Sequence, residues 1–143
     1  MSEIPDPVVL KGFNAKLVEE FRANGGKVSG PFEGADLLVL TTTGAKSGQP
    51  RVSPLAYQRV DGKLLIIGSY RGADIDPAWV HNLRANPQAH IEIGTDSYDV
   101  VARELRPDER SPVWAQIVAV APGFGEYQAN TSRVIPVFEL TRV

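Results

Sequence analysis

The chain has 143 residues, a length that suits one domain over residues 1–143, in which 1–30 form an N-terminal helical segment. It contains no cysteine, which excludes disulfide scaffolds, thiol nucleophiles and Cys-type zinc sites. The net charge of −2 argues against a nucleic-acid partner, and no stretch approaches the roughly 18 apolar residues of a transmembrane helix. The acidic, proline-rich N-terminus does not resemble a signal peptide, so we expect a cytoplasmic protein.

The first half of the chain predicts one helix followed by three strands. Apolar residues recur every four positions over 7–23, which indicates an amphipathic helix. Strands are expected at 36–43, 51–60 and 63–68, because these runs are apolar or rich in β-branched residues. The Asp61-Gly62 pair between the last two strands is typical of a tight hairpin turn.

The second half predicts two helices and three more strands. Asp76-Pro77 reads as a helix start, with Asp76 as the N-cap and Pro77 as the first helical residue. Strands are expected at 89–93, 98–105 and 134–140, and a further helix runs from Pro107 to the Pro122-Gly123 break. Short turns join most strand pairs. The fold class is therefore α+β, with about six mainly antiparallel strands that favour a small barrel.

The stretch TTTGAKSGQPRVSP, residues 41–54, lies between the first two strands. It lacks the G-x-x-x-x-G-K-[ST] spacing of a phosphate loop, and its prolines discourage a following helix. A glycine-containing turn can nevertheless bind an anion through successive backbone N–H groups. Lys46 adds a mobile charge, Arg51 a planar fork, and Ser47 a hydroxyl. The alternative is an ordinary hairpin with surface cations.

The local charge supports an anionic ligand. Residues 44–72 carry five basic side chains and one acid, Asp61, so this segment has a charge of about +4 in an acidic chain. The basic residues are Lys46, Arg51, Arg59, Lys63 and Arg71. A solvated basic surface would have the same composition, so this alternative stays open.

A second candidate segment, GSYRGADIDPAWVHN at 68–82, follows a buried strand and leads into a helix N-terminus, where the dipole favours anions. Trp79 offers a flat face and Asn82 a polar group, although a helical tryptophan more often packs in the core. His81 and His90 have no third ligand nearby, so no metal site is expected. Neither a G-x-S-x-G elbow nor a Rossmann fingerprint occurs.

Three motifs together resemble a known family. LLVLTTTGAKSGQPRVSPL, IIGSYRGADIDPAWVHNLRANP and PGFGEYQANTSRVIPVFEL are similar to the deazaflavin-dependent nitroreductases of actinobacteria. The resemblance runs from about Leu37 to the C-terminus. It implies a split β-barrel of the FMN-binding type and the reduced deazaflavin coenzyme F420 (8-hydroxy-5-deazaflavin), with FMN as the second choice.

The resemblance also implies roles for individual positions. The turn would hold the phosphate and acidic tail, and the second strand would line the coenzyme's path. Residues 67–70 would lie along the ring, and residues 78–82 would add contacts from the helix start. The implied coenzyme contacts are Ala45, Lys46, Ser47, Arg51, Val52, Ser53, Pro54, Leu55, Ala56, Ile67, Gly68, Ser69, Tyr70, Ala78, Trp79, Val80, His81 and Asn82. Phe124 and Tyr127 would cover the substrate side, and Ser69 or Tyr127 would supply a proton.

Two positions differ from the nitroimidazole-activating member of that family, which has lysine where this chain has Tyr70 and tyrosine where it has Phe124. We expect coenzyme binding to survive both differences. Nitro-prodrug activation is called into question, because the substrate face lacks one hydroxyl.

The resemblance implies an F420H2-dependent reductase that transfers a hydride to a small electrophile, such as an activated enone, a quinone or a nitroaromatic. A non-catalytic carrier of deazaflavin or flavin is the alternative, and an FMN oxidase of the same barrel class is a third reading. The natural substrate and the oligomeric state are left open. A homodimer is compatible with the sequence. The N-terminal helix could contact a membrane surface, but its mixed polar residues favour packing on the barrel.

Overall fold

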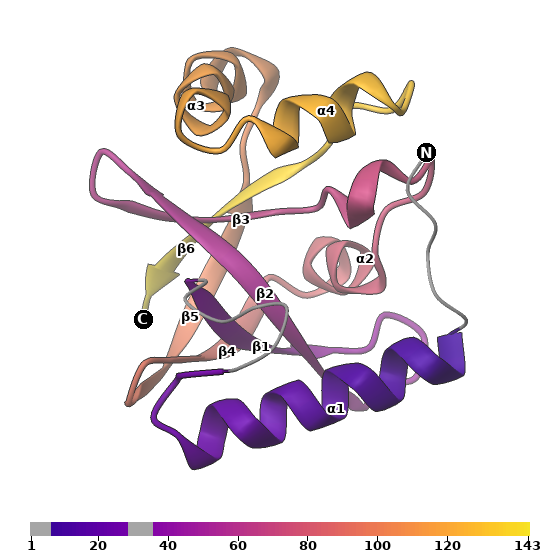
Figure 1. Cartoon of the computed structure of the whole chain (residues 1–143), viewed down its shortest axis with the longest axis vertical. Helices are drawn as coiled ribbons and strands as arrows, with labels where there is room; N and C mark the ends of the chain where they lie inside the picture. Colours follow the sequence, from indigo (N-terminus) through magenta and orange to yellow (C-terminus); the bar gives the residue numbers. More distant parts are fainter. Residues whose placement is uncertain (1–6, 29–35) are drawn as a thin grey trace.

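The computed structural model describes residues 7–28 and 36–143, and the side chains of 14–28, 36–70 and 72–143. Within this part, six strands form a closed barrel in the order β1-β2-β3-β6-β5-β4, and every neighbouring pair is antiparallel (Figure 1). The strands are β1 (Leu37–Thr43), β2 (Pro50–Val60), β3 (Lys63–Ile67), β4 (Gln88–Ile93), β5 (Asp96–Glu104) and β6 (Val137–Arg142). The predicted α+β barrel is confirmed.

Helices cover opposite sides of this barrel. α1 runs along one side, whereas α3 and α4 lie together on the other (Figure 1). The helices of the described residues are α1 (Pro7–Ala23), α2 (Ala78–Ala85), α3 (Pro107–Val120) and α4 (Gly123–Ala129), and the 3₁₀ turn η2 spans Tyr70–Gly72. No helix of the described residues is long and apolar enough to cross a membrane.

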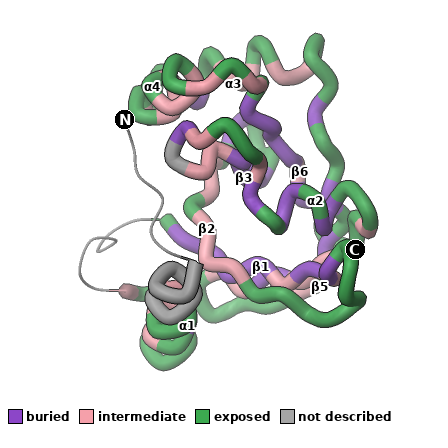
Figure 2. The backbone as a smooth tube through the Cα atoms, turned by 90° about the vertical axis from the view of Figure 1, so that its right-hand side faces the viewer, coloured by how far each residue is buried: buried purple, intermediate pink, exposed green. Residues whose placement is uncertain are grey.

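The core explains why β1 and β3 are apolar without alternation. In β1, Leu38 and Leu40 face the barrel interior, while Leu37 and Val39 pack beneath Val18 and Phe21 of α1. The residues of β3 divide in the same way between the interior and a cluster beneath α3. A strand that is covered on both faces needs apolar residues at every position. Figure 2 shows these strands as the buried centre of the molecule, with α1 on the outside.

The turn between β2 and β3 has the predicted geometry. Asp61 and Gly62 both have positive φ, +53° and +79°. This combination is the type I′ turn that matches the twist of a two-residue hairpin, and Asp-Gly is a favoured sequence for it.

Three details of the predicted elements are wrong. Pro77 is the N-cap residue of α2, and the carboxylate of Asp76 does not cap the helix because it pairs with Arg84 and Arg133. The last strand starts at Val137 and not at 134, since Pro136 has no N–H for the sheet. α4 was not predicted, because two glycines within seven residues disfavour a helix in isolation.

The interior packing predicts the effect of a core truncation. Leu40 is fully buried between β2 and β4. Leu40→Ala should therefore lower the free energy of unfolding by about 3 kcal/mol, the usual cost of a leucine-sized cavity. Val101→Ala on the exposed face of β5 is the matched control and should change it by about 0.5 kcal/mol or less. Urea denaturation measures both, and equal losses would contradict the described core.

Candidate active site

The turn between β1 and β2 is closed by its own hydrogen bonds. The N–H of Gly44 donates to the carbonyl of Gln49 at 2.8 Å, and the N–H of Gly48 donates to the carbonyl of Gly44 at 2.9 Å. The N–H of Gln49 donates to the hydroxyl of Ser47 at 3.2 Å. Glycine is needed twice: Gly48 has a φ of +69°, and a Cβ on Gly44 would lie 2.6 Å from Ser47 Oγ.

Asn82 fastens this turn to α2. Its side chain is buried, with a relative exposure of 6 %. Its Oδ1 accepts the N–H of Ala45 at 2.9 Å, and its Nδ2 donates to the hydroxyl of Thr42 at 3.0 Å. Because both ends of a buried amide are bonded to one turn, Asn82 fixes the position of that turn relative to the helix.

The turn retains donors and charge that the described residues do not satisfy. The N–H groups of Lys46 and Ser47 have no acceptor there, and the side chains of Lys46 and Arg51 have no carboxylate partner. Arg51 donates only to Ser47 Oγ, at 3.2 Å. By contrast, the other cleft arginine, Arg22, is paired with an acid. Two free N–H groups beside two uncompensated cations form an environment suited to an anion.

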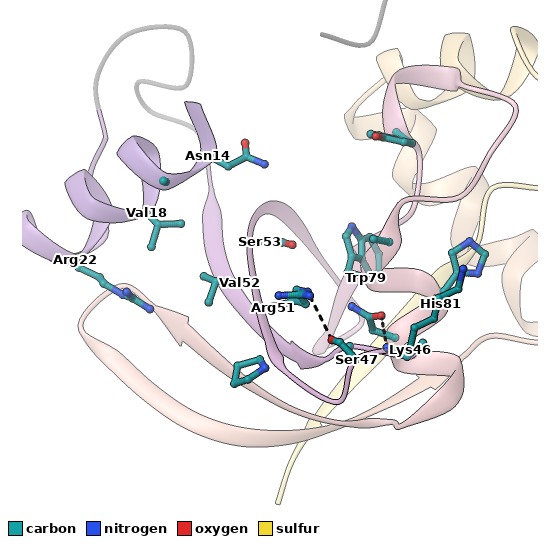
Figure 3. A pocket seen from close by; sticks show the side chains of 17 residues that line it. Asn14, Val18, Arg22, Lys46, Ser47, Arg51, Val52, Ser53, Trp79 and His81 are labelled. Carbon is teal, nitrogen blue, oxygen red and sulfur yellow. Dashed lines mark hydrogen bonds between the residues drawn. The ribbon is translucent and has the colours of Figure 1, made fainter. Parts of the chain in front are cut away.

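This turn forms one end of a cleft with a volume of about 900 Å³. Side chains from α1 face β2 across it, and α2 contributes Trp79 and His81 (Figure 3). Lys46, Ser47 and Arg51 make the turn end polar and basic, whereas Val18 and Val52 add apolar surface between α1 and β2. The lining residues are Asn14, Ala15, Val18, Arg22, Gly44, Ala45, Lys46, Ser47, Pro50, Arg51, Val52, Ser53, Tyr70, Ala78, Trp79, His81 and Asn82.

Comparison with known proteins identifies the family. The model of the F420H(2)-dependent quinone reductase family matches residues 15–142. The chain belongs to this family. The F420H(2)-dependent quinone reductase Rv1261c of Mycobacterium tuberculosis is 38% identical, over 85% of each chain. The putative F420H(2)-dependent quinone reductase Rv3178 of the same species is 36% identical, over 72% of this chain and 87% of its own.

Solved structures agree with this assignment. An F420-H2 dependent reductase, FDR-A, is 38% identical and has a TM-score of 0.66, covering 74% of this chain and 94% of its own. A structure described as a domain-swapped dimer is 33% identical with a TM-score of 0.68, covering 95% of this chain and 100% of its own. The resemblance to F420-dependent reductases and the split-barrel fold are confirmed, and the family favours an enzyme over a non-catalytic carrier.

Many of the coenzyme contacts predicted for this F420-dependent reductase come together in the cleft. Those that line it are Ala45, Lys46, Ser47, Arg51, Val52, Ser53, Tyr70, Ala78, Trp79, His81 and Asn82. Those outside the lining are Pro54, Leu55, Ala56, Ile67, Gly68, Ser69 and Val80. Val80 is fully buried in the barrel interior, and Ile67 packs beneath α3. Trp79 lines the cleft while also packing edge-on against Phe138, with ring centroids 5.8 Å apart. Trp79 can therefore be both a core residue and a cleft residue.

The two aromatic residues predicted for the substrate side belong to α4 and lie outside the cleft lining. Phe124 and Tyr127 are in edge contact, with ring centroids 6.2 Å apart, and both pack against the core cluster beneath α3. The backbone of α4 abuts η2, because a Cβ on Gly72 would lie 2.9 Å from the carbonyl oxygen of Tyr127. α4 thus supports the loop that carries Tyr70, and the substrate role of its aromatics stays a prediction.

Sequence reasoning missed the wall that α1 provides. Asn14, Val18 and Arg22 are four residues apart and share one helical face, which lines the cleft together with Ala15. The guanidinium of Arg22 makes two hydrogen bonds of 2.8 Å to Glu92 on β4. These bonds raise the pKa of Arg22 and lower the pKa of Glu92. Packing of this helix on the barrel was expected and is confirmed, but the four-residue spacing did not indicate that one of its faces would line the cleft.

The bonds of Asn82 yield a prediction about the cleft. Asn82→Ala should lower the free energy of unfolding by about 2 kcal/mol, because it leaves Thr42 and the Ala45 N–H without their partner. It should also weaken F420 binding, since the turn loses its attachment. The control Asn130→Ala, at an exposed position in the chain, should change both within error. Thermal unfolding and a coenzyme titration measure the two effects. If Asn82→Ala is less stable but binds F420 normally, Asn82 contributes to stability and is not needed to hold the turn for binding.

Proposed function

We propose that the chain is an F420H2-dependent reductase that transfers a hydride to a quinone-type acceptor bound in the cleft. The observation that carries this proposal is the Asn82-held turn, where Lys46, Arg51 and two N–H groups meet without a carboxylate or backbone acceptor among the described residues. Members of the family are named for F420H(2) and quinones. Activated enones and nitroaromatics are the further acceptor classes to test.

The residues present fit the coenzyme. F420 carries an anionic tail and a flat ring, and the cleft has a basic end and apolar walls. A charge-assisted hydrogen bond contributes about 1.5–3 kcal/mol, so contacts from Lys46 and Arg51 can anchor a phosphate. The volume of about 900 Å³ lies in the range of small-molecule sites. Val18, Val52 and Trp79 can bury ring surface.

When bound, the reduced coenzyme supplies the hydride. The work of the chain is to hold its tail, to orient the acceptor beside its ring and to exclude water. The acceptor then needs a proton, and we propose Ser69 or Tyr127 as its source. The hydroxyl of Ser69 has no hydrogen-bond partner among the described residues and adjoins Tyr70, which lines the cleft. Neither residue lines the cleft itself. Ser69 is our first choice because it is next to a lining residue, whereas the Tyr127 ring packs on the core cluster beneath α3.

We propose a cytoplasmic location and a homodimer as the oligomeric state. The absence of cysteine suits a reducing compartment. One structural relative is described as a domain-swapped dimer. Sedimentation equilibrium tests the dimer, and a single monomer mass at micromolar concentration would exclude it.

The proposed function predicts which coenzyme the protein prefers. F420 should bind at least about tenfold more tightly than FMN, because the turn offers several contacts to the longer anionic tail of F420. Fluorescence titration of the same preparation with each coenzyme measures the ratio. Tighter binding of FMN would refute the coenzyme assignment.

The second prediction concerns the two cations. Lys46→Ala and Arg51→Ala should each weaken F420 binding by about 1–3 kcal/mol, through loss of a charge-assisted bond. The loss should be smaller at high salt, where exposed charges are screened. Lys63→Ala, an exposed lysine beside the β2–β3 turn and outside the cleft, is the control and should bind normally. If both cleft variants bind like the control at low salt, the turn is only a hairpin.

The third prediction compares the two proton donors. Ser69→Ala should slow quinone reduction at saturating coenzyme by about 10²-fold, the lower end for a positioned donor. Tyr127→Phe should slow it less than Ser69→Ala does, because the Tyr127 ring packs against Phe124 and the core cluster beneath α3, outside the cleft lining. Stopped-flow oxidation of the bound reduced coenzyme measures both rates. A slower Tyr127→Phe would assign proton supply to α4, and two fully active variants would assign it to solvent.

A further inference from the structure

The guanidinium of Arg133 is bound almost entirely by one loop, residues 68–76. Its Nη1 donates to the carbonyl of Gly68 at 3.1 Å, its Nη2 to the carbonyl of Ser69 at 2.8 Å, and its Nε to the carbonyl of Ala73 at 2.7 Å. Nη1 also bonds Asp76 Oδ1 at 2.8 Å. The side chain of Arg133 is only 14% exposed. A planar five-donor fork is the one side chain that can satisfy such a set of acceptors.

The loop held in this way has a strained backbone. Tyr70 has a φ of +46°, which is unfavourable for any residue with a side chain. The N–H of Gly72 donates to the Ser69 carbonyl at 2.9 Å, and the N–H of Ala73 donates to the Tyr70 carbonyl at 3.1 Å. The Ser69 carbonyl thus accepts from both the Gly72 N–H and Arg133. The bond from Arg133 stabilises a turn in which the backbone of Tyr70 is strained.

Both ends of this arrangement are anchored. Asp76 also accepts from Arg84 at 3.0 Å, and Arg84 pairs with Glu104 on β5. On the other side, the carbonyl of Arg133 accepts from Gln128 of α4 at 2.7 Å. The Arg133 fork is therefore held in place between the barrel and α4, and it does not move freely with the loop.

Tyr70 is the residue of this loop that lines the cleft. Arg133 does not line the cleft. The cationic turn, which also lines the cleft, is held by Asn82 and shares no hydrogen bond with Arg133 among the described residues. We propose that Arg133 is a positioning residue of the reductase: it holds residues 68–73 so that Tyr70 stays in the cleft wall beside the reacting groups. This proposal rests on the proposed function.

The first test needs no coenzyme. In Arg133→Lys, hydrogen exchange at the amides of Gly72 and Ala73 should accelerate by about tenfold or more, because a lysine ammonium cannot bond all four acceptors. Arg103→Lys is the matched control, since Arg103 pairs with Glu109 and Glu139 on the surface away from the cleft. Unchanged exchange in a folded Arg133→Lys would overturn the proposal.

The second test separates positioning from a general loss of stability. Arg133→Lys should bind F420 within about threefold of wild type, because the turn is held by Asn82, but should reduce the acceptor at least about tenfold more slowly. In a Tyr70→Gly background, where positive φ carries no strain, the same substitution should have little further effect on turnover. Additive effects on turnover, or losses that merely parallel the fall in thermal stability, would overturn the proposal.

The two proposals fail in different ways. If wild-type protein does not bind F420, the proposed function fails, and the role of Arg133 in reduction falls with it whatever the exchange experiment shows. If wild type binds and reduces normally but Arg133→Lys does so too, only the positioning role fails.

Discussion

The structure depends on β1 being enclosed from four directions. It pairs with β2 along one edge and with β4 along the other, which closes the barrel. Its two faces are buried by the barrel interior and by α1. A strand without a free edge or face cannot shift its register without exposing apolar side chains. The turn that follows β1 therefore starts from a fixed position. This turn and the start of β2 carry Lys46 and Arg51, which line the cleft.

The distribution of charge shows which cations are structural. Arg22, Arg84, Arg103 and Arg133 each pair with a carboxylate in the described part of the chain. In the Arg103 cluster, the hydrogen bond from Arg103 lowers the pKa of Glu109 to about 2. Lys46 and Arg51 are left without such partners, although the chain is acidic overall. Arg59 and Lys63 also lack a carboxylate partner among the described residues, so the argument for an anionic ligand rests on Lys46 and Arg51 lining the same cleft.

Local patterns were sufficient to predict most of the barrel. The β1 run, the Asp61-Gly62 hairpin and the amphipathic repeat of α1 are signals contained within a few residues of each other, and the structure has all three. The turn at 44–49 was also recognisable, because glycine, lysine and arginine occur close together in the chain. The resemblance to a family then predicted coenzyme contacts in α2 for residues that periodicity alone would have assigned only to the core.

The features that sequence reasoning missed all depend on contacts between distant segments. The α1 wall required knowing that Asn14 and Val18 face β2, and the helical repeat does not specify a partner surface. α4 forms where the chain packs against η2 and α3, despite its glycines. Arg133 is 57 residues from Asp76 and 64 from Ser69 in the chain, so no local pattern links them. The sequence predicts Asp76 as a helix cap because the Asp-Pro pair is a local signal, whereas its partners Arg84 and Arg133 are evident only in the folded structure.

Two separate attachments hold two parts of the cleft wall. Asn82 bonds the cationic turn through its amide, and Arg133 bonds the Tyr70 loop through its guanidinium. α2 is the element between them, since Asn82 lies on it and Asp76 precedes it. Buried hydrogen bonds of this kind fix geometry more than they add stability. The cationic turn and the Tyr70 loop, which both line the cleft, are therefore held by different side chains. Under the proposed function, substitutions in the 68–76 loop would change the acceptor site without loosening the turn.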